Sequence, residues 1–301
     1  MERITFKNIY GINIAANLYN PIEKEENKKY PAVVISGPVG MVKEQCTGMY
    51  AEKMAKNGFI SIAFDPAFYG QSEGIPRYLA DPNIEVENIS AAIDFLLDKT
   101  DADKKRLAVI GMAEGGGFSV KAAMLDRRIE AAAVISPINY GRLIRTESEK
   151  NAITLLKKNS RKRTDSLLKE NTEYVSIVPD SYRGSKDIDQ SESWEYYNDK
   201  ERGNKDSWEN KIIEKAMDKA AGFDAFNLAE QLLTVPIMII VGEKHGSFGA
   251  YKDADCLYEK AASKKKEYIT MRESSHVSLY DDPIRVGKTI EMINDFLRKY
   301  L

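Results

Sequence analysis

The stretch Gly111-Met112-Ala113-Glu114-Gly115-Gly116-Gly117 decides the fold of this chain. It follows the apolar, β-branched run Leu107–Ile110 and precedes an apolar pattern of helical period. A strand, a sharp turn and a helix in this order are typical of a nucleophile elbow, which holds a Ser or Cys above a sheet. Gly111 and Gly115 fit the elbow, because residues without a Cβ let strand and helix approach closely. Ala113 stands where the nucleophile should be, and its methyl group cannot attack a substrate.

Alternating and apolar runs before the elbow predict the first half of a sheet. Ile4–Lys7 and Ile12–Leu18 alternate around a Tyr10-Gly11 turn, which predicts an opening β-hairpin. Pro31–Ser36 and Phe59–Phe64 predict buried strands with a helix between them. Because strands and helices alternate, we expect an α/β fold with a mostly parallel, doubly wound sheet covered by helices on both faces.

Further signals continue this pattern on both sides of the elbow. Asp81-Pro82 predicts the start of a helix, since Asp is a good N-cap and Pro suits the first helical position. Ala131–Ile135, Pro236–Val241 and Tyr268–Met271 predict three more strands. Val286–Tyr300 predicts the closing helix.

An insertion interrupts the alternation. Charged residues and scattered aromatics dominate from about Tyr140 to Asn227, which predicts helices and loops rather than sheet. We therefore expect a cap over residues 140–227, on a core made of residues 1–139 and 228–301. The insertion leaves the sheet at the edge that carries the elbow, so the cap should cover it.

Composition argues against several partners and cofactors. A formal net charge of −2 gives no electrostatic reason to expect nucleic acid or an anionic membrane as a partner. The apolar runs are too short to span a bilayer, and no leader pattern opens the chain, so we expect a cytoplasmic protein. With two cysteines and two histidines, we expect neither a disulfide framework nor a metal site.

The glycine run Gly115–Gly117 does not indicate a nucleotide site. It extends into neither a G-x-G-x-x-G pattern nor a P-loop. We expect no cofactor and a small-molecule substrate as the partner, while a homo-oligomer stays open.

Acyl transfer through a nucleophile also needs a histidine base and a carboxylate that orients it. His276 lies just after the last expected strand and before the last helix, which suits the base. The acid should follow the strand before that one, where Glu243 is the nearest carboxylate and our candidate. Asp253 and Asp255 should lie on the next helix as surface charges. His245 is an alternative residue of this loop and is expected to line the substrate pocket.

Two backbone N–H groups should stabilise an oxyanion at this site. One belongs to Glu114, immediately after the elbow residue. The other should come from the Gly37-Pro38-Val39-Gly40 turn, and Val39 is the expected donor. Gly37 is expected to border the substrate pocket.

Aromatic residues of the insertion should roof the pocket, because large aromatic side chains are costly to leave in water. Trp194, Tyr196 and Tyr197 are the best candidates, since they interrupt a polar, loop-like stretch. Tyr69, which follows a core strand, should face them from below. Other aromatics, such as Phe223 and Phe226, are expected to serve packing within the cap.

Several motifs give the chain a resemblance to the dienelactone-hydrolase-like branch of bacterial α/β-hydrolases. Besides the elbow, these motifs are Gly37–Gln45, Phe64–Ser72, Pro76–Pro82, Asp126–Ile129, Val134–Pro137, Glu195–Tyr197, Phe223–Phe226 and His276–Asp281. The resemblance implies the α/β-hydrolase fold and hydrolysis of a small carboxylic ester, thioester or lactone. The chain departs from that branch at Ala113, where Ser or Cys is usual, and at Gly37, where His is usual. It also lacks an evident Asp after the penultimate strand.

Ala113 leaves two readings open. It is either an engineered substitution in an active hydrolase or the natural residue of a relative that does not hydrolyse. In the first case the native scaffold is an enzyme, and this chain is inactive for want of a nucleophile. In the second, the protein binds a ligand without catalysis. His276 acting as a base in lyase chemistry, without a covalent intermediate, is a further alternative.

Overall fold

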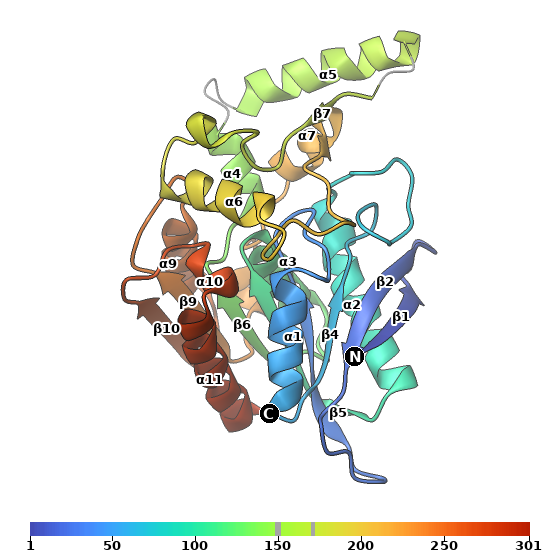
Figure 1. The fold of residues 1–301 in the computed structure, drawn as a ribbon, viewed down its shortest axis with the longest axis vertical. Coiled ribbons are helices and arrows are strands. Elements are labelled where there is room, and N and C mark those ends of the chain that lie inside the picture. The colour runs from blue at the N-terminus through green and yellow to red at the C-terminus, as the bar shows by residue number, and fades with distance from the viewer. Residues whose placement is uncertain (148–151, 170–171) are drawn as a thin grey trace.

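The computed structural model describes residues 1–147, 152–169 and 172–301. Its centre is a sheet of eight strands in the order β1-β2-β4-β3-β5-β6-β9-β10 (Figure 1). The strands are β1 Glu2–Lys7, β2 Asn13–Tyr19, β3 Tyr30–Ser36, β4 Ile60–Phe64, β5 Ala102–Met112, β6 Ala131–Ile135, β9 Ile237–Gly242 and β10 Lys266–Met271. The pairs β1–β2 and β2–β4 are antiparallel, and every pair from β4 to β10 is parallel. The expected mostly parallel sheet, with its opening hairpin, is confirmed.

Helices cover both faces of this sheet, and strands such as β4, β6 and β9 are therefore buried along their whole length. α1 Cys46–Lys56 and α11 Pro283–Tyr300 lie together on one face (Figure 1). α2 Pro82–Lys99 packs with α3 Glu114–Leu125 on the other face. α9 Ala250–Lys260 follows β9, and the short α10 Ser278–Asp281 precedes α11.

Local signals in the sequence set where two of these helices begin. The Asp81 side chain accepts a hydrogen bond from the backbone of the first turn of α2, and Pro82 opens the helix. Asp282 caps α11 in the same way, directly before Pro283. Each cap satisfies N–H groups that the helix itself leaves without a partner.

Between β6 and β9 the chain leaves the sheet and forms a separate layer, here called the cap, at the top of the view in Figure 1. The cap contains α4 Tyr140–Glu147, α5 Ala152–Lys169, β7 Tyr174–Val175, a short helical turn at Tyr182–Gly184, α6 Ile188–Asn198, β8 Ile212–Ile213, a second turn at Glu214–Ala216 and α7 Met217–Ala221. α8 Ala229–Leu232 leads back to β9. β7 and β8 pair as a two-stranded antiparallel sheet, which the sequence did not indicate, because two residues are too few to show alternation.

The elbow between β5 and α3 depends on glycines that lie against backbone atoms. A Cβ at Gly111 would lie 2.4 Å from the carbonyl oxygen of Gly115. A Cβ at Gly115 would lie 2.4 Å from the carbonyl oxygen of Gly37 and 2.5 Å from that of Ser36. None of these three oxygens belongs to a side chain that could rotate away, so a larger residue at either glycine would force the backbone apart.

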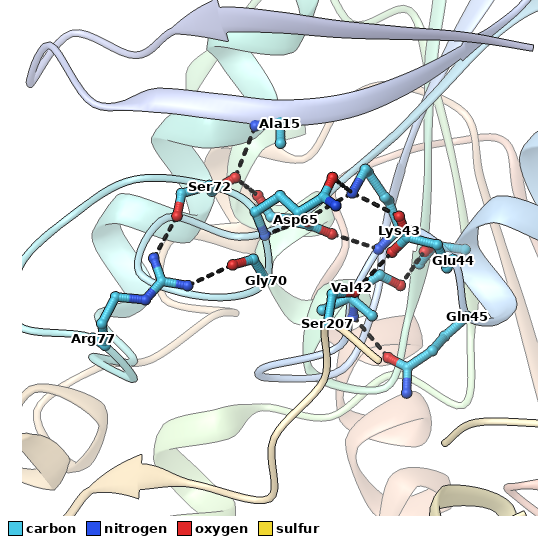
Figure 2. A network of polar contacts seen from close by, with 12 residues as sticks. Ala15, Val42, Lys43, Glu44, Gln45, Asp65, Gly70, Ser72, Arg77 and Ser207 are labelled. Carbon is cyan, nitrogen blue, oxygen red and sulfur yellow. Dashed lines mark hydrogen bonds and ion pairs between the residues drawn. The ribbon is translucent and has the colours of Figure 1, made fainter. Parts of the chain in front are cut away.

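A buried ion pair ties the loop between β3 and α1 to the end of β4 (Figure 2). Lys43 Nζ lies 2.9 Å from Asp65 Oδ2, and the two side chains are 1% and 0% exposed. Asp65 also accepts from the backbone N–H of Lys43 at 2.7 Å and from that of Gln71 at 2.8 Å. Burial raises the pKa of Asp65 although Lys43 acts in the opposite direction, so the charged carboxylate depends on these partners.

The same network connects this loop to the cap (Figure 2). The Glu44 carboxylate lies 2.7 Å from Lys43 Nζ and accepts a hydrogen bond from Ser207 Oγ at 3.2 Å. The Gln45 side chain donates to the carbonyl oxygen of Gly203. The loop after β3 is therefore held both by the core and by the cap.

Replacing Gly115 with Ala is expected to destabilise the protein by about 1–3 kcal/mol, because the new methyl group would meet two backbone carbonyls. Gly287→Ala is the matched control. Gly287 is exposed in α11, and a Cβ there would have nothing within 4 Å. In that variant the free energy of unfolding should rise by about 0.5–1 kcal/mol, because Ala has the higher helix propensity. Urea unfolding measures the stability of both variants. An equal change in stability in the two would contradict the crowding argument.

Lys43→Met is expected to destabilise the protein by about 3–5 kcal/mol, because it leaves Asp65 buried without its cation. Lys56→Met serves as the control. The Lys56 side chain is 56% exposed and pairs with Glu52 in α1, so its loss should change stability by less than about 1 kcal/mol. The midpoints of denaturant unfolding are compared for Lys43→Met and Lys56→Met. Similar midpoints would mean that the ion pair does not secure the loop.

Candidate active site

Ala113 lies at the turn between β5 and α3 with φ +49° and ψ −124°. This conformation is strained for any residue but glycine and is concentrated at functional turns. The Ala113 N–H donates to Ile135 O at 3.1 Å, and its own carbonyl oxygen accepts from Gly116 and Ile138 at 2.9 Å each. The backbone thus has the geometry of a nucleophile elbow, although the side chain is a methyl group.

A cavity of about 130 Å³ is lined by Ala113. The core supplies its floor through the loop after β3, the elbow and the turn after β10, and the cap supplies further walls. Most lining side chains are apolar, among them Val39, Ile138, Leu143, Val175, Ile212 and Phe248. An apolar cavity with a few converging polar groups is the usual form of a small-molecule site.

Val39 and Glu114, the expected oxyanion donors, both line this cavity. The Val39 N–H, however, donates to Oε2 of Glu114 at 3.4 Å. The sequence indicated a role for the backbone of Glu114 but not this contact of its side chain. A carboxylate beside the expected oxyanion position would oppose negative charge that develops there. The helix dipole favours a carboxylate in the first turn of α3, but it does not show that this carboxylate turns toward Val39.

His276 follows β10, lines the cavity and is 4% exposed. Its Nε2 lies 2.9 Å from the hydroxyl of Tyr280, which also lines the cavity. Burial lowers the pKa of His276 to about 4, so the ring is neutral at neutral pH, as a general base requires. Burial also raises the pKa of Tyr280 well above its usual value, so the phenol stays protonated. Tyr280 was missed, although a spacing of four residues from His276 is one helical turn.

Glu243 does not reach His276, which contradicts its expected role as the acid. Its side chain is exposed and accepts a hydrogen bond from the Glu273 N–H at 2.8 Å. Position in the sequence showed that Glu243 follows β9, but not to which side of the loop its carboxylate turns. Asp253 lies on the next helix, α9, as expected, but it is not a surface charge, because it is buried with its Oδ2 2.5 Å from Arg142 Nη2.

Of the aromatics expected to roof the pocket, Tyr197 lines the cavity and stacks on Trp208 with ring centroids 4.6 Å apart. Tyr196 is buried beside it, and its hydroxyl accepts from the Cys46 N–H at 3.0 Å, which ties the cap to α1. Trp194 packs edge-on against a tyrosine elsewhere in the cap. Only one of the three lines the cavity because their segment is the helix α6 and not the loop-like stretch expected. Successive residues of a helix face different sides.

Three other expected pocket residues do not contribute to the cavity wall in the described part of the chain. Tyr69 is buried with its ring centroid 6.0 Å from that of Tyr78. A Cβ at Gly37 would lie 2.7 Å from a side chain of α1, so a larger residue there would have to displace that side chain. His245 is exposed and stacks on Tyr251 with ring centroids 4.0 Å apart.

Within residues 1–147, 152–169 and 172–301, no three His, Cys, Asp or Glu side chains are grouped as a metal ion would require. No helix in these same ranges combines the length and the apolar character needed to cross a membrane.

Comparison with known proteins extends over almost the whole chain. The chain is 32% identical to the uncharacterized protein YcjY of Escherichia coli (strain K12), over 100% of this chain and 99% of that one. The crystal structure of hypothetical protein PA2218 from Pseudomonas aeruginosa matches with a TM-score of 0.89 at 28% identity, covering 100% of this chain and 93% of that one. Thiohydrolase aneE of Aspergillus aculeatus is 30% identical over 46% of this chain and 42% of its own length.

A family model described as X-Pro dipeptidyl-peptidase (S15 family) matches residues 10–278. This range takes in the elbow, the cap and His276. The chain is therefore a member of the X-Pro dipeptidyl-peptidase (S15) family of hydrolases and has the α/β-hydrolase fold.

Proposed function

We propose that this scaffold hydrolyses a small carboxylic ester, thioester or lactone by acyl transfer, and that the present chain lacks the nucleophile. The observation that carries the proposal is Ala113, which has the conformation of an elbow residue and lines the same cavity as His276. A Ser or Cys at position 113 would attack the acyl carbon, and His276 would accept its proton. The N–H groups of Val39 and Glu114 would stabilise the oxyanion.

The size and lining of the cavity favour a small acyl compound over a peptide. Its volume of about 130 Å³ is below the roughly 300–1,000 Å³ of sites for drug-sized ligands. The apolar walls suit a short acyl chain or ring with one carbonyl group. The relative named thiohydrolase aneE supports a thioester. The resemblance to the dienelactone-hydrolase-like branch supports a lactone.

A second candidate function is binding of the same class of compound without turnover. Two features of the site favour it together. Ala113 carries no nucleophilic atom, and the Val39 N–H that should stabilise the oxyanion donates to Glu114 instead. Base chemistry at His276 without a covalent intermediate would instead require activity of the unmodified chain that His276→Ala abolishes.

Ala113→Ser and Ala113→Cys are expected to raise the hydrolysis of short-chain p-nitrophenyl esters and acyl thioesters by about 10²-fold or more. Loss of a triad nucleophile costs on the order of 10⁶ in kcat, so its return should be measurable even in an imperfect site. Ala113→Gly, which adds no nucleophile, is the matched control. The double variant Ala113→Ser, His276→Ala should return to the level of that control.

Well-folded Ser and Cys variants that hydrolyse no ester, thioester or lactone above the Ala113→Gly level would refute the acyl-transfer proposal. If such variants still bind a product carboxylate or lactone in calorimetry, the second candidate function would be supported in its place.

In the Ala113→Ser background, Glu114→Gln is expected to raise kcat/KM by roughly tenfold, which corresponds to about 1.4 kcal/mol of transition-state stabilisation. Gln removes the negative charge beside the Val39 N–H and keeps the shape of the side chain. Glu130→Gln, an exposed substitution of the same kind, should have no effect. A fall in kcat/KM for Glu114→Gln would instead mean that the carboxylate takes part in the reaction.

A further inference from the structure

Two buried polar atoms without hydrogen-bond partners belong to residues that line one small void beside His276. Nδ1 of His276 and Oδ1 of Asp189 have no partner in the part of the chain that the structure describes. The two residues are 4% and 2% exposed. The void has a volume of about 10 Å³, and both residues line it together with Gly246. Buried polar atoms are costly to leave unpaired, so each of these two atoms calls for a partner.

Asp189 is held firmly in the first turn of α6. Its Oδ2 accepts a hydrogen bond from the Phe248 N–H at 2.9 Å, which leaves Oδ1 for another partner. Asp187, the N-cap of α6, accepts from the Ser247 N–H at 2.9 Å. Two carboxylates thus bind the loop after β9 to the start of this cap helix.

Gly246 shows that the Asp189 carboxyl group occupies the place of a missing side chain. A Cβ at Gly246 would lie 2.2 Å from Asp189 Cγ. In the chain order of this fold the acid lies between the nucleophile and the histidine, and the loop after β9 was where we expected it. A carboxylate from the cap therefore lies where a side chain from that loop would otherwise project.

The face of α6 that carries Asp189 is also the face that borders the main cavity. Ser193 and Tyr197, four and eight residues after Asp189, both line that cavity. Residues at this spacing share one side of a helix, and these three are 2%, 3% and 3% exposed. Glu192 of the same helix accepts a hydrogen bond from the hydroxyl of Ser275, the neighbour of His276. α6 therefore packs directly on the turn that holds the histidine.

We propose that Asp189 is the positioning residue for His276 and acts through one water molecule in the void between them. This rests on the proposed function, in which His276 is the base. A void of about 10 Å³ has room for roughly one water, which needs at least two polar partners. The Nδ1–H of His276 donates to the water, and the water donates to Oδ1 of Asp189. Nε2 is then unprotonated and accepts from the Tyr280 hydroxyl, which is the tautomer that a base requires.

The charge on Asp189 agrees with this arrangement at neutral pH. Burial raises the pKa of Asp189 to about 6, with a smaller contribution from the neighbouring carboxylates of Asp187 and Glu192. The hydrogen bond from the Phe248 N–H acts in the opposite direction. Above that pH the carboxylate is ionised and accepts hydrogen bonds only, so it favours a proton on Nδ1 of His276.

The tautomer of His276 can be read directly, because the chain contains only two histidines. Long-range ¹H–¹⁵N correlation spectra at about pH 8 distinguish an Nδ1–H ring from an Nε2–H ring. His245→Gln identifies which signals belong to His276. The unmodified chain, with Ala113 in place, is expected to show His276 in the Nδ1–H form.

Asp189→Asn is expected to reverse this tautomer. The Asn side chain must offer its oxygen to the Phe248 N–H, so its NH₂ group faces the void and donates to the water. The water then donates to Nδ1, and the ring proton moves to Nε2. Glu195→Gln removes one charge from an exposed position of the same helix and should leave the tautomer unchanged.

An Nε2–H ring in the unmodified protein, or the same tautomer in Asp189→Asn, overturns the proposal. The first of these results needs no variant, so a folding defect in Asp189→Asn does not remove the test. In an active Ala113→Ser protein, Asp189→Asn should lower kcat by about 10²-fold or more with little change in KM. Failure of acyl transfer in Ala113→Ser would leave the tautomer result standing, so the two proposals can fail separately.

Discussion

Close contact between two stretches of backbone determines the geometry of this site. The start of α3 rests on the carbonyl groups that end β3, and this contact exists because Gly115 has no side chain. Val39, in the loop after β3, and Glu114, in the elbow, thereby line the same cavity. The strained turn at Ala113 costs on the order of 1–3 kcal/mol, which surrounding hydrogen bonds must offset.

Polar contacts on the far side of the same loop maintain this arrangement. The Lys43–Asp65 pair fixes the loop to β4, while Ser72 joins the end of β4 to β2 by donating to Asp65 O at 2.7 Å and accepting from the Ala15 N–H at 2.9 Å (Figure 2). The backbone frame of the proposed site is therefore held from both sides, and the departures from acyl-transfer chemistry lie in side chains: the methyl group of Ala113, the carboxylate of Glu114, and Glu243, which does not reach His276. Such local changes in an intact frame alter reactivity without altering the fold.

The sequence predicted the elements whose signals are local. The Tyr10-Gly11 turn, the Asp81 cap and the glycines of the elbow each act within a few residues, so the sheet and its helices followed from them. The site was predicted less well, because side-chain direction decides it. Glu243 has the right place in the chain but turns to the Glu273 backbone. Asp189 went unnoticed because its segment was read as a loop, and only a helix brings it to the same face as Ser193 and Tyr197.

The position of α6 has a consequence for how the protein can change over evolutionary time. This helix lines the cavity beside Ala113 through Ser193 and Tyr197, and its Glu192 accepts a hydrogen bond from Ser275 of the turn that holds His276. A substitution that reshapes the pocket by shifting α6 therefore also shifts the environment of His276. In the proposed reaction, substrate range and proton transfer would then be epistatic, since residues that share a packed element do not contribute additively. Divergence of substrate preference in such a scaffold would require paired substitutions in the cap and in the turn after β10.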